Sequence, residues 1–149
     1  MYRSILVATD GSEYSARAVK QAALLAKMSG AKLLLFHAAP NTRMPGYVEG
    51  AGTELVREVN EIANNNRDAE AKGVLSDAHT ALGFPDISIE ELFVVNDSPY
   101  QAILETARYR DCDLIVMAPH GHHGIAGILL GSETQKVLTH SKVPVLVVH

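Results

Sequence analysis

A glycine-rich stretch in the last third of the chain has the residue types and spacing to bind an anion. Four glycines separate the short apolar run 114–117 from Ser132, where a helical pattern begins: Gly121, Gly124, Gly127 and Gly131. A strand, a glycine-rich loop and a helix start in this order allow backbone N–H groups to converge on an anion. No Lys, Arg, Asp or Glu lies between the run and Ser132. The sequence therefore predicts a phosphate site that relies on main-chain dipoles.

Three histidines in the same stretch suggest a second kind of chemistry. His120, His122 and His123 are close enough in the sequence to bind a transition metal together, but no Cys or carboxylate joins them locally. An imidazole with an ordinary pKa of about 6.5 would attract phosphate when protonated. We favour this second role, which predicts tighter nucleotide binding in mild acid, and keep the metal site as the alternative.

Residue patterns of familiar catalytic sites are largely missing. The glycines are not followed by a P-loop lysine, and we find neither a serine-centred nucleophile elbow nor a Cys or His spacing typical of structural zinc. Cys112 lies between Asp111 and Asp113, whose charges would raise its pKa and keep the thiol unreactive. Since fast phosphoryl transfer needs cations at the phosphates, the sequence favours binding over catalysis.

Composition and charge limit the class of protein. A chain of 149 residues with 47% apolar and 20% charged residues is typical of one globular domain, expected over residues 1–149. The net charge of −4 argues against a nucleic-acid partner. The apolar runs are much shorter than the roughly 20 residues that span a bilayer, and no signal-peptide pattern is present. We expect a cytoplasmic protein without membrane contact.

Strand and helix patterns alternate along the whole chain. Apolar runs predict strands at 5–8, 33–39, 87–95, 114–117 and 145–148. Helices are expected between them, with the first capped by Asp10 or Ser12. Ser98 and Ser132 each precede a glutamine three positions later, which predicts capping boxes at the last two helices. Such alternation is typical of an α/β protein, an open parallel sheet with helices on both faces.

The second helix is expected to be long and amphipathic. From Thr53 a stripe of apolar residues (Leu55, Val59, Ile62 and Ala63) is separated from charged ones (Glu54, Arg57, Glu58 and Glu61). The pattern leaves open whether the helix ends at Gly73 or continues to Gly83. We favour continuation, because no other strong breaker occurs between these glycines.

The glycine spacing resembles the nucleotide loop of the universal stress protein family, which reads Gly, two residues, Gly, nine residues, Gly and then Ser or Thr. Gly121, Gly131 and Ser132 match it in register, and Ala118 stands where the first glycine is expected. The resemblance extends over nearly the whole chain, from Asp10 after the first strand to the run 144–148 at the end. It implies an adenine nucleotide alpha hydrolase-like fold with five parallel strands in the order 3-2-1-4-5.

The resemblance also implies a set of nucleotide-binding residues. The backbone of Ala38 is expected to meet the adenine, and Asp10 the ribose or a metal. The remaining positions line the sugar and phosphates, so that the full set is Ala8, Thr9, Asp10, Ala38, Met117, Ala118, His120, Gly121, Gly131, Ser132, Glu133 and Thr134. Structural alternatives are that Asp10 and Ser132 only cap helices and that the glycines only form a flexible loop.

Three functions follow from the resemblance. The first is a binding protein that holds ATP, ADP or AMP with Mg²⁺ and signals its nucleotide state to an unknown protein partner in a stress response. The second is a slow ATPase or self-phosphorylating protein that uses Ser132 or Thr134. The third is a homodimer that acts without nucleotide, because Ala118 replaces a glycine.

A homodimer is expected in every case. Val143–Val148 contains an apolar strand that would lie at an open edge of the sheet, and natural proteins seldom leave such an edge unpaired. Pairing of this strand with a second copy about a twofold axis, as in the family, would cover it.

Overall fold

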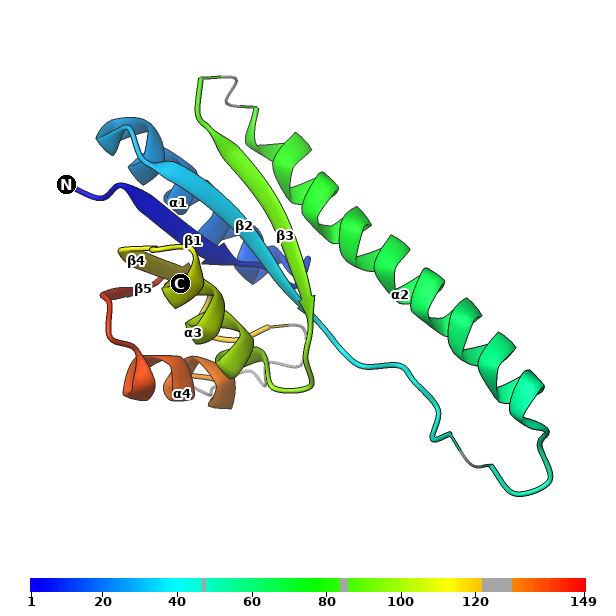
Figure 1. Ribbon diagram of the computed structural model, residues 1–149. Helices are drawn as coiled ribbons and strands as arrows, with labels where there is room; N and C mark the ends of the chain where they lie inside the picture. Colours follow the sequence, from blue (N-terminus) through cyan, green and yellow to red (C-terminus); the bar gives the residue numbers. More distant parts are fainter. Residues whose placement is uncertain (47, 84–85, 122–129) are drawn as a thin grey trace.

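The computed structural model describes residues 1–46, 48–83, 86–121 and 130–149. Within these residues, parallel strands form one sheet in the order β3-β2-β1-β4-β5 (Figure 1). The strands are β1 (Ser4–Ala8), β2 (Lys32–Ala39), β3 (Ile89–Val95), β4 (Leu114–Met117) and β5 (Val145–Val147). This order agrees with the one implied by the resemblance, so the predicted fold class is confirmed.

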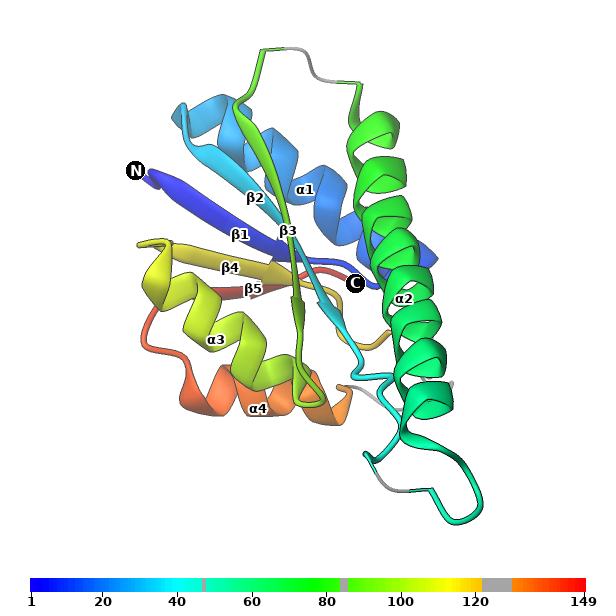
Figure 2. The same cartoon turned by 45° about the vertical axis from the view of Figure 1, so that its right-hand side comes forward.

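Helices cover both faces of the sheet (Figure 2). The helix α1 (Glu13–Ser29) and the helix α2 (Thr53–Leu82) lie on one face, whereas α3 (Pro99–Tyr109) and α4 (Ser132–His140) lie on the other. Each described helix is too short or too polar to cross a membrane. The helix that follows β1 and the helix that follows β4 thus lie on opposite faces of the sheet, although β1 and β4 are neighbouring strands.

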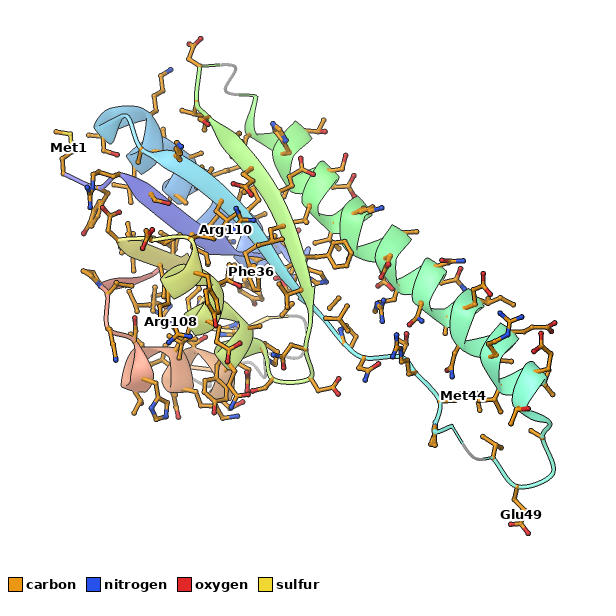
Figure 3. All side chains as sticks on the ribbon, in the orientation of Figure 1. Met1, Phe36, Met44, Glu49, Arg108 and Arg110 are labelled. Atoms are coloured by element: carbon orange, nitrogen blue, oxygen red, sulfur yellow. The ribbon has the colours of Figure 1, made fainter. Side chains whose placement is uncertain are left out.

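The hydrophobic core has two layers because successive strand residues point to opposite faces of the sheet. In β1, Ile5 and Val7 pack under α1 and α2, while Leu6 packs under α3. Phe36 of β2 is 1% exposed and belongs to the α3 layer (Figure 3). Ala22 and its alanine neighbours let α1 approach the sheet closely.

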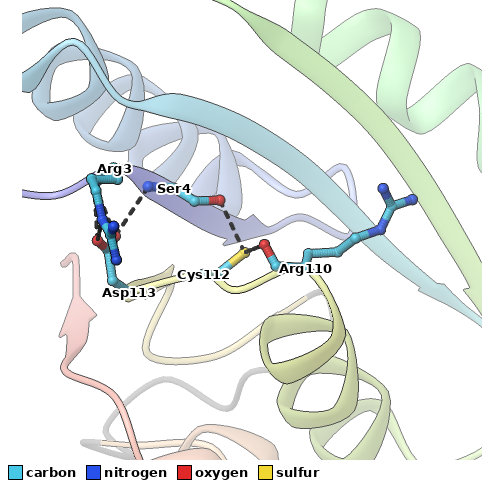
Figure 4. Close-up of polar contacts among 5 residues, drawn as sticks. All are labelled: Arg3, Ser4, Arg110, Cys112 and Asp113. Atoms are coloured by element: carbon cyan, nitrogen blue, oxygen red, sulfur yellow. Dashed lines mark hydrogen bonds and ion pairs between the residues drawn. The ribbon is translucent and has the colours of Figure 1, made fainter.

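Polar contacts fix the starts of β1 and β4 beside each other (Figure 4). The Asp113 carboxylate accepts hydrogen bonds from the backbone N–H groups of Arg3, at 2.9 Å, and Ser4, at 3.1 Å. Desolvation opposes the effect, but these bonds hold the pKa of Asp113 below its ordinary value. The Ser4 hydroxyl donates to Cys112 Sγ, and burial raises the pKa of this thiol, as expected for an unreactive cysteine.

The boundaries of the elements are close to those predicted. Helix α2 continues to Leu82, and Gly83 ends it with a φ of 59°, so the favoured continuation past Gly73 is confirmed. The strand β3 begins at Ile89 rather than at Ile87, and β5 ends at Val147 rather than at Val148.

Two predicted helix caps are wrong. Ser12 caps α1 through its hydroxyl, which accepts from Ser15 N–H at 3.2 Å, as one of the two alternatives proposed. The N-cap of α4, however, is Gly131, so Ser132 is already the first helical residue. Ser98 occupies the N-cap position of α3 but makes no side-chain cap bond there.

The apolar stripe predicted for the start of α2 is real, but the body of the protein does not bury it. Leu55 is 55% exposed and Ile62 is 61% exposed, whereas Val56 is 6% exposed. The reason is that the first half of α2 extends beyond the ends of the strands, where no sheet lies beneath it (Figures 1 and 2).

Candidate functional site

The candidate site lies at the carboxyl ends of β1 and β4, where the strand order reverses. β1 and β4 are neighbours, with Val7 opposite Val116. Because α1 and α4 leave this edge on opposite faces of the sheet, the turns that follow the two strands diverge and leave a crevice. Both turns therefore border one crevice, as the contact between Asp10 and Gly121 described below indicates.

Asp10 and Gly121 meet across the crevice. The Asp10 Oδ1 accepts a hydrogen bond from Ser12 N–H at 3.0 Å, which fixes the turn into α1. A Cβ atom added to Gly121 would lie 2.2 Å from Asp10 Oδ2, far inside van der Waals contact. Glycine at 121 therefore leaves room for the Asp10 carboxylate. This position of the glycine pattern is explained by the close approach of Asp10, not by a backbone conformation that only glycine adopts.

Gly131 closes the other end of the loop. Its N–H donates to the Pro119 carbonyl at 2.7 Å, and an added Cβ would lie 3.2 Å from the same oxygen. The start of α4 is thus held against the residues that follow β4. Gly124 and Gly127, the other two glycines of the pattern, lie outside the described residues.

Within the part of the chain that the structure describes, no side chain caps the first turn of α4. Its N-cap is a glycine and Ser132 is exposed, and the N–H groups of this turn lie at the positive end of the helix dipole. Two other helices have side-chain partners at their starts: Ser12 caps α1, and Glu133 Oε2 accepts from Tyr100 N–H of α3 at 2.9 Å. Helix α2, like α4, begins at a glycine without a side-chain cap. An uncapped helix start beside a glycine-rich loop suits an anionic ligand.

Glu133 has a structural role that the sequence did not indicate. Its carboxylate bridges the start of α3 and Lys136, whose Nζ lies 2.8 Å from Oε1. The hydrogen bond to Glu133 raises the pKa of Lys136, and the attraction of the two charges adds to this effect. The sequence shows only that Glu133 is an acidic residue in the first turn of its own helix. It does not show that the Glu133 side chain binds the start of a different helix.

Several predicted site residues are buried and hold the crevice together. Thr134 is 2% exposed, and its hydroxyl donates to the Ala118 carbonyl at 3.1 Å. Thr9 Oγ1 lies 3.0 Å from Ser15 Oγ and accepts from Gly11 N–H. Met117 and Ala118 are 6% and 7% exposed, and Ala8 is half-buried. Ala118 does not have a positive φ, so its backbone conformation does not require the glycine of the family pattern.

The backbone of Ala38 faces the crevice. In β2, Phe36 C=O accepts from Thr9 N–H, so alternate residues of this strand direct their polar groups toward β1. β1 has ended before it reaches the level of Ala38, and the Thr9 carbonyl is occupied by His37 Nδ1 at 2.8 Å. Ala38 therefore offers an N–H donor and a C=O acceptor to a planar ligand edge. The position of His37 at the end of a strand suggests a structural or crevice-lining role, and its bond to Thr9 agrees with this role.

His120 is the one histidine of the loop that the structure describes, and it packs against Tyr14 of α1 with ring centroids 4.4 Å apart. Among the described residues nothing hydrogen-bonds its buried Nδ1. His122 and His123 lie outside the described residues. The described part of the chain contains no group of three metal-binding side chains.

A hollow of about 330 Å³ opens beside the turn after β1. Thr9, Asp10 and Ser12 form one wall, and Lys20 of α1 and Asp77 of α2 lie further along it. Most of the rest of its lining belongs to α1 and α2, so the hollow adjoins the crevice at Asp10 and does not reach the start of α4.

Comparisons with known proteins agree with this arrangement. The universal stress protein family matches residues 1–149. A universal stress protein of Thermus aquaticus is 34% identical over 148 residues, which cover 99% of this chain and 99% of the relative. Universal stress protein MJ0577 of Methanocaldococcus jannaschii is 28% identical over 156 residues, with 99% and 95% covered.

Solved structures share the fold. The structure of MJ0577 has a TM-score of 0.82 at 28% identity and covers 99% of this chain and 96% of that one. A universal stress protein in complex with cAMP has a TM-score of 0.68 at 34% identity, with 99% and 97% covered. A protein of Archaeoglobus fulgidus in complex with dAMP, at 23% identity and a TM-score of 0.68, supports the fold alone.

Proposed function

This chain belongs to the universal stress protein family, and from that premise we propose that it binds an adenine nucleotide in the crevice between β1 and β4. ATP is the proposed ligand, with ADP and AMP as alternatives, and the proposed role is to signal the nucleotide state in a stress response. The solved universal stress protein in complex with cAMP, at 34% identity and a TM-score of 0.68, supports the adenine part of this proposal.

One observation carries the proposal: the uncapped start of α4 lies on the same crevice as the Asp10 carboxylate. Gly131 holds that helix start against Pro119, and Gly121 leaves room for Asp10 on the facing wall. The helix N–H groups suit a phosphate, and a carboxylate suits the hydroxyls of a ribose. A nucleotide has both groups, at opposite ends of its sugar.

We assign the ligand contacts on this basis. The N–H and C=O of Ala38 recognise the adenine edge, and Asp10 with Thr9 and Ala8 borders the ribose. The N–H groups of Ser132, Glu133 and Thr134 face the phosphates, while Gly131 fixes the helix start through its own bond to Pro119. Met117, Ala118, His120 and Gly121 form the floor of the site. Side chains that are already hydrogen-bonded, such as those of Thr134 and Glu133, act by fixing the backbone.

Magnesium fits this site only together with the nucleotide. Mg²⁺ prefers oxygen ligands and is commonly held by one or two carboxylates and by substrate phosphates. Asp10 is the described carboxylate on the crevice, and the Ser132 hydroxyl is exposed at the start of α4. We propose that Mg²⁺ arrives with ATP, where it would neutralise phosphate charge beside a loop, residues 118–131, whose sequence contains no Lys or Arg.

Calorimetry with ATP, ADP, AMP and cAMP tests the proposal, with Gly121→Ala as the variant. The added methyl must displace Asp10 Oδ2, so we expect at least about tenfold weaker binding of the preferred nucleotide. Gly46→Ala is the matched control, because Gly46 has open space at its Cβ position and lies outside the crevice. No heat with any nucleotide at millimolar concentration, and no nucleotide in acid extracts of the purified protein, would favour the nucleotide-free alternative.

A slow ATPase remains the second candidate because the Ser132 hydroxyl is exposed at the helix start. Thr134 is a poorer phosphate acceptor, since it is buried and its hydroxyl is bonded to Ala118. Accumulation of ADP or of phosphorylated protein over hours, lost in Ser132→Ala, would favour catalysis over binding alone.

We further propose a homodimer through Val143–Val148. Pro144 and Val148 bond to β4 through their backbones, so the polar groups of Val145 and Val147 point to the open edge of the sheet, and Leu146 is 38% exposed. Sedimentation should show a dimer that Val147→Pro disrupts and Val147→Thr retains, because only proline removes the N–H.

Three further expectations stay predictions. They are a single domain over residues 1–149, a cytoplasmic location, and the absence of nucleic-acid and membrane partners.

A further inference from the structure

The first half of α2 presents an apolar surface to solvent. Leu55, Val59 and Ile62, which we call the arm stripe, are 55%, 36% and 61% exposed. They are four and three residues apart, so they form one line along the helix. This part of α2 projects past the ends of the strands (Figures 1 and 2), which leaves the arm stripe on a free helix rather than over the core.

The rotation of this helix is fixed, so the arm stripe is not exposed by chance. Met44 lies in the loop before α2 (Figure 3). It donates its N–H to Asn60 Oδ1 at 2.7 Å and accepts from Asn60 Nδ2 through its carbonyl. The Thr42 hydroxyl donates to the Ala63 carbonyl, and Val56 is 6% exposed on the same inward side. Turning the arm stripe inward would break these bonds and expose Val56.

A line of carboxylates runs beside the arm stripe. Glu58 is three residues after Leu55 and four before Ile62, and Glu54 and Glu61 continue its line along the helix. Arg57 is the one arginine or lysine in this stretch of sequence, and it is engaged by Glu54 Oε1 at 2.6 Å and by Glu61 at 3.9 Å. Arg43 lines a hollow with Arg57 and Glu61, so it lies near one end of this line, whereas Glu58 does not line the hollow. The edge of the stripe is therefore acidic.

We propose that the arm stripe binds an amphipathic helix of another protein, with apolar residues at matching spacing and Lys or Arg along its edge. Apolar side chains at i, i+3/i+4 and i+7 are the recognised way for one helix to dock on another. The glutamates favour a partner helix with a basic edge and repel one with an acidic edge. Two copies of this chain paired through the stripe would bring the same glutamates together, and an anionic membrane would be repelled.

Two synthetic helical peptides test this inference on the full chain. Both carry leucines at the spacing of the arm stripe; one has lysines along the edge and the other has glutamates. Fluorescence anisotropy should show binding of the lysine peptide that weakens with salt, and binding of the glutamate peptide at least about tenfold weaker. The double variant Val59→Asn, Ile62→Asn should weaken lysine-peptide binding about tenfold or more.

Matched variants distinguish binding at the arm stripe from non-specific binding to other exposed apolar residues. Leu24→Asn, Met28→Asn replaces two exposed apolar residues of α1, which are 43% and 80% exposed, and should leave peptide binding unchanged. Glu58→Lys should shift preference toward the glutamate peptide, with circular dichroism confirming an intact fold. Equal binding of both peptides, binding that the α1 variant abolishes, or sedimentation of a dimer that only the stripe variant disrupts would overturn the inference. Nucleotide binding by the stripe variant is expected to be unchanged, so this result is independent of the proposed function.

Discussion

The two halves of α2 contain similar apolar residues in opposite surroundings. Leu75 in the second half is 2% exposed and packs into the core beneath α1 and α2, whereas Leu55 in the first half is 55% exposed. The second half lies over the sheet and the first half extends past it (Figure 1). A helical pattern thus shows which residues share a face, but only the sheet beneath decides which face is covered.

The largest expected effect comes from truncating one leucine in each half. Leu75→Ala should lower the free energy of unfolding by about 2–5 kcal/mol, because it removes buried methyl groups and leaves a cavity. Leu55→Ala makes the same chemical change at an exposed site and should alter stability by less than about 0.5 kcal/mol. Urea unfolding followed by circular dichroism measures both. Equal losses would mean that the arm stripe is covered in the free protein.

A smaller effect is expected at Gly73, which lies within the second half of α2. A Cβ atom at this position meets nothing within 4 Å, and the residue is helical. Gly73→Ala should therefore raise the free energy of unfolding by about 0.5–1 kcal/mol, by reducing the freedom of the unfolded chain. Gly46→Ala, in a loop with equal space, is the control. A loss of stability would indicate that the helix must bend at this position.

Local patterns were sufficient to predict most of the fold. Short apolar runs and helical spacing identify β1, α1 and the length of α2, because burial between two layers requires these patterns. The strand order came from the resemblance to the family. Periodicity predicts which residues form strands, but not which strands are neighbours in the sheet. The errors lie at ends: β3 starts two residues later than predicted, because Ile87 packs on the core without joining the sheet.

The site was less predictable because its contacts join distant residues. Glycine spacing identified Gly121 and Gly131, but not that Asp10 explains the first and Pro119 the second. A capping box was predicted at Ser98, whereas the carboxylate that reaches α3 belongs to Glu133, a residue 33 positions from the one it binds. Sequence spacing cannot reveal such a pair. The predicted box at Ser98 satisfied the local rule, but tertiary packing supplied Glu133 as the partner instead.

The smallest expected effect concerns charge in the exposed half of α2. The hydrogen bond from Arg57 holds the pKa of Glu54 below its ordinary value of 4.5, with slight opposition from desolvation. Because the folded pKa is the lower one, the contribution of this pair is present above the ordinary pKa and is lost as the pH falls through the folded value. NMR titration of the Glu54 carboxyl should follow this course, and Arg57→Gln should move its midpoint up toward the ordinary value. The pair is exposed, so the first turn of α2 should loosen in acid while the urea midpoint assigned to the second half barely moves.

A contrary result would be a Glu54 carboxyl that titrates at its ordinary pKa in the unmodified protein. The ion pair with Arg57 would then not persist in solution, and the acidic edge of the arm stripe would be more strongly negative.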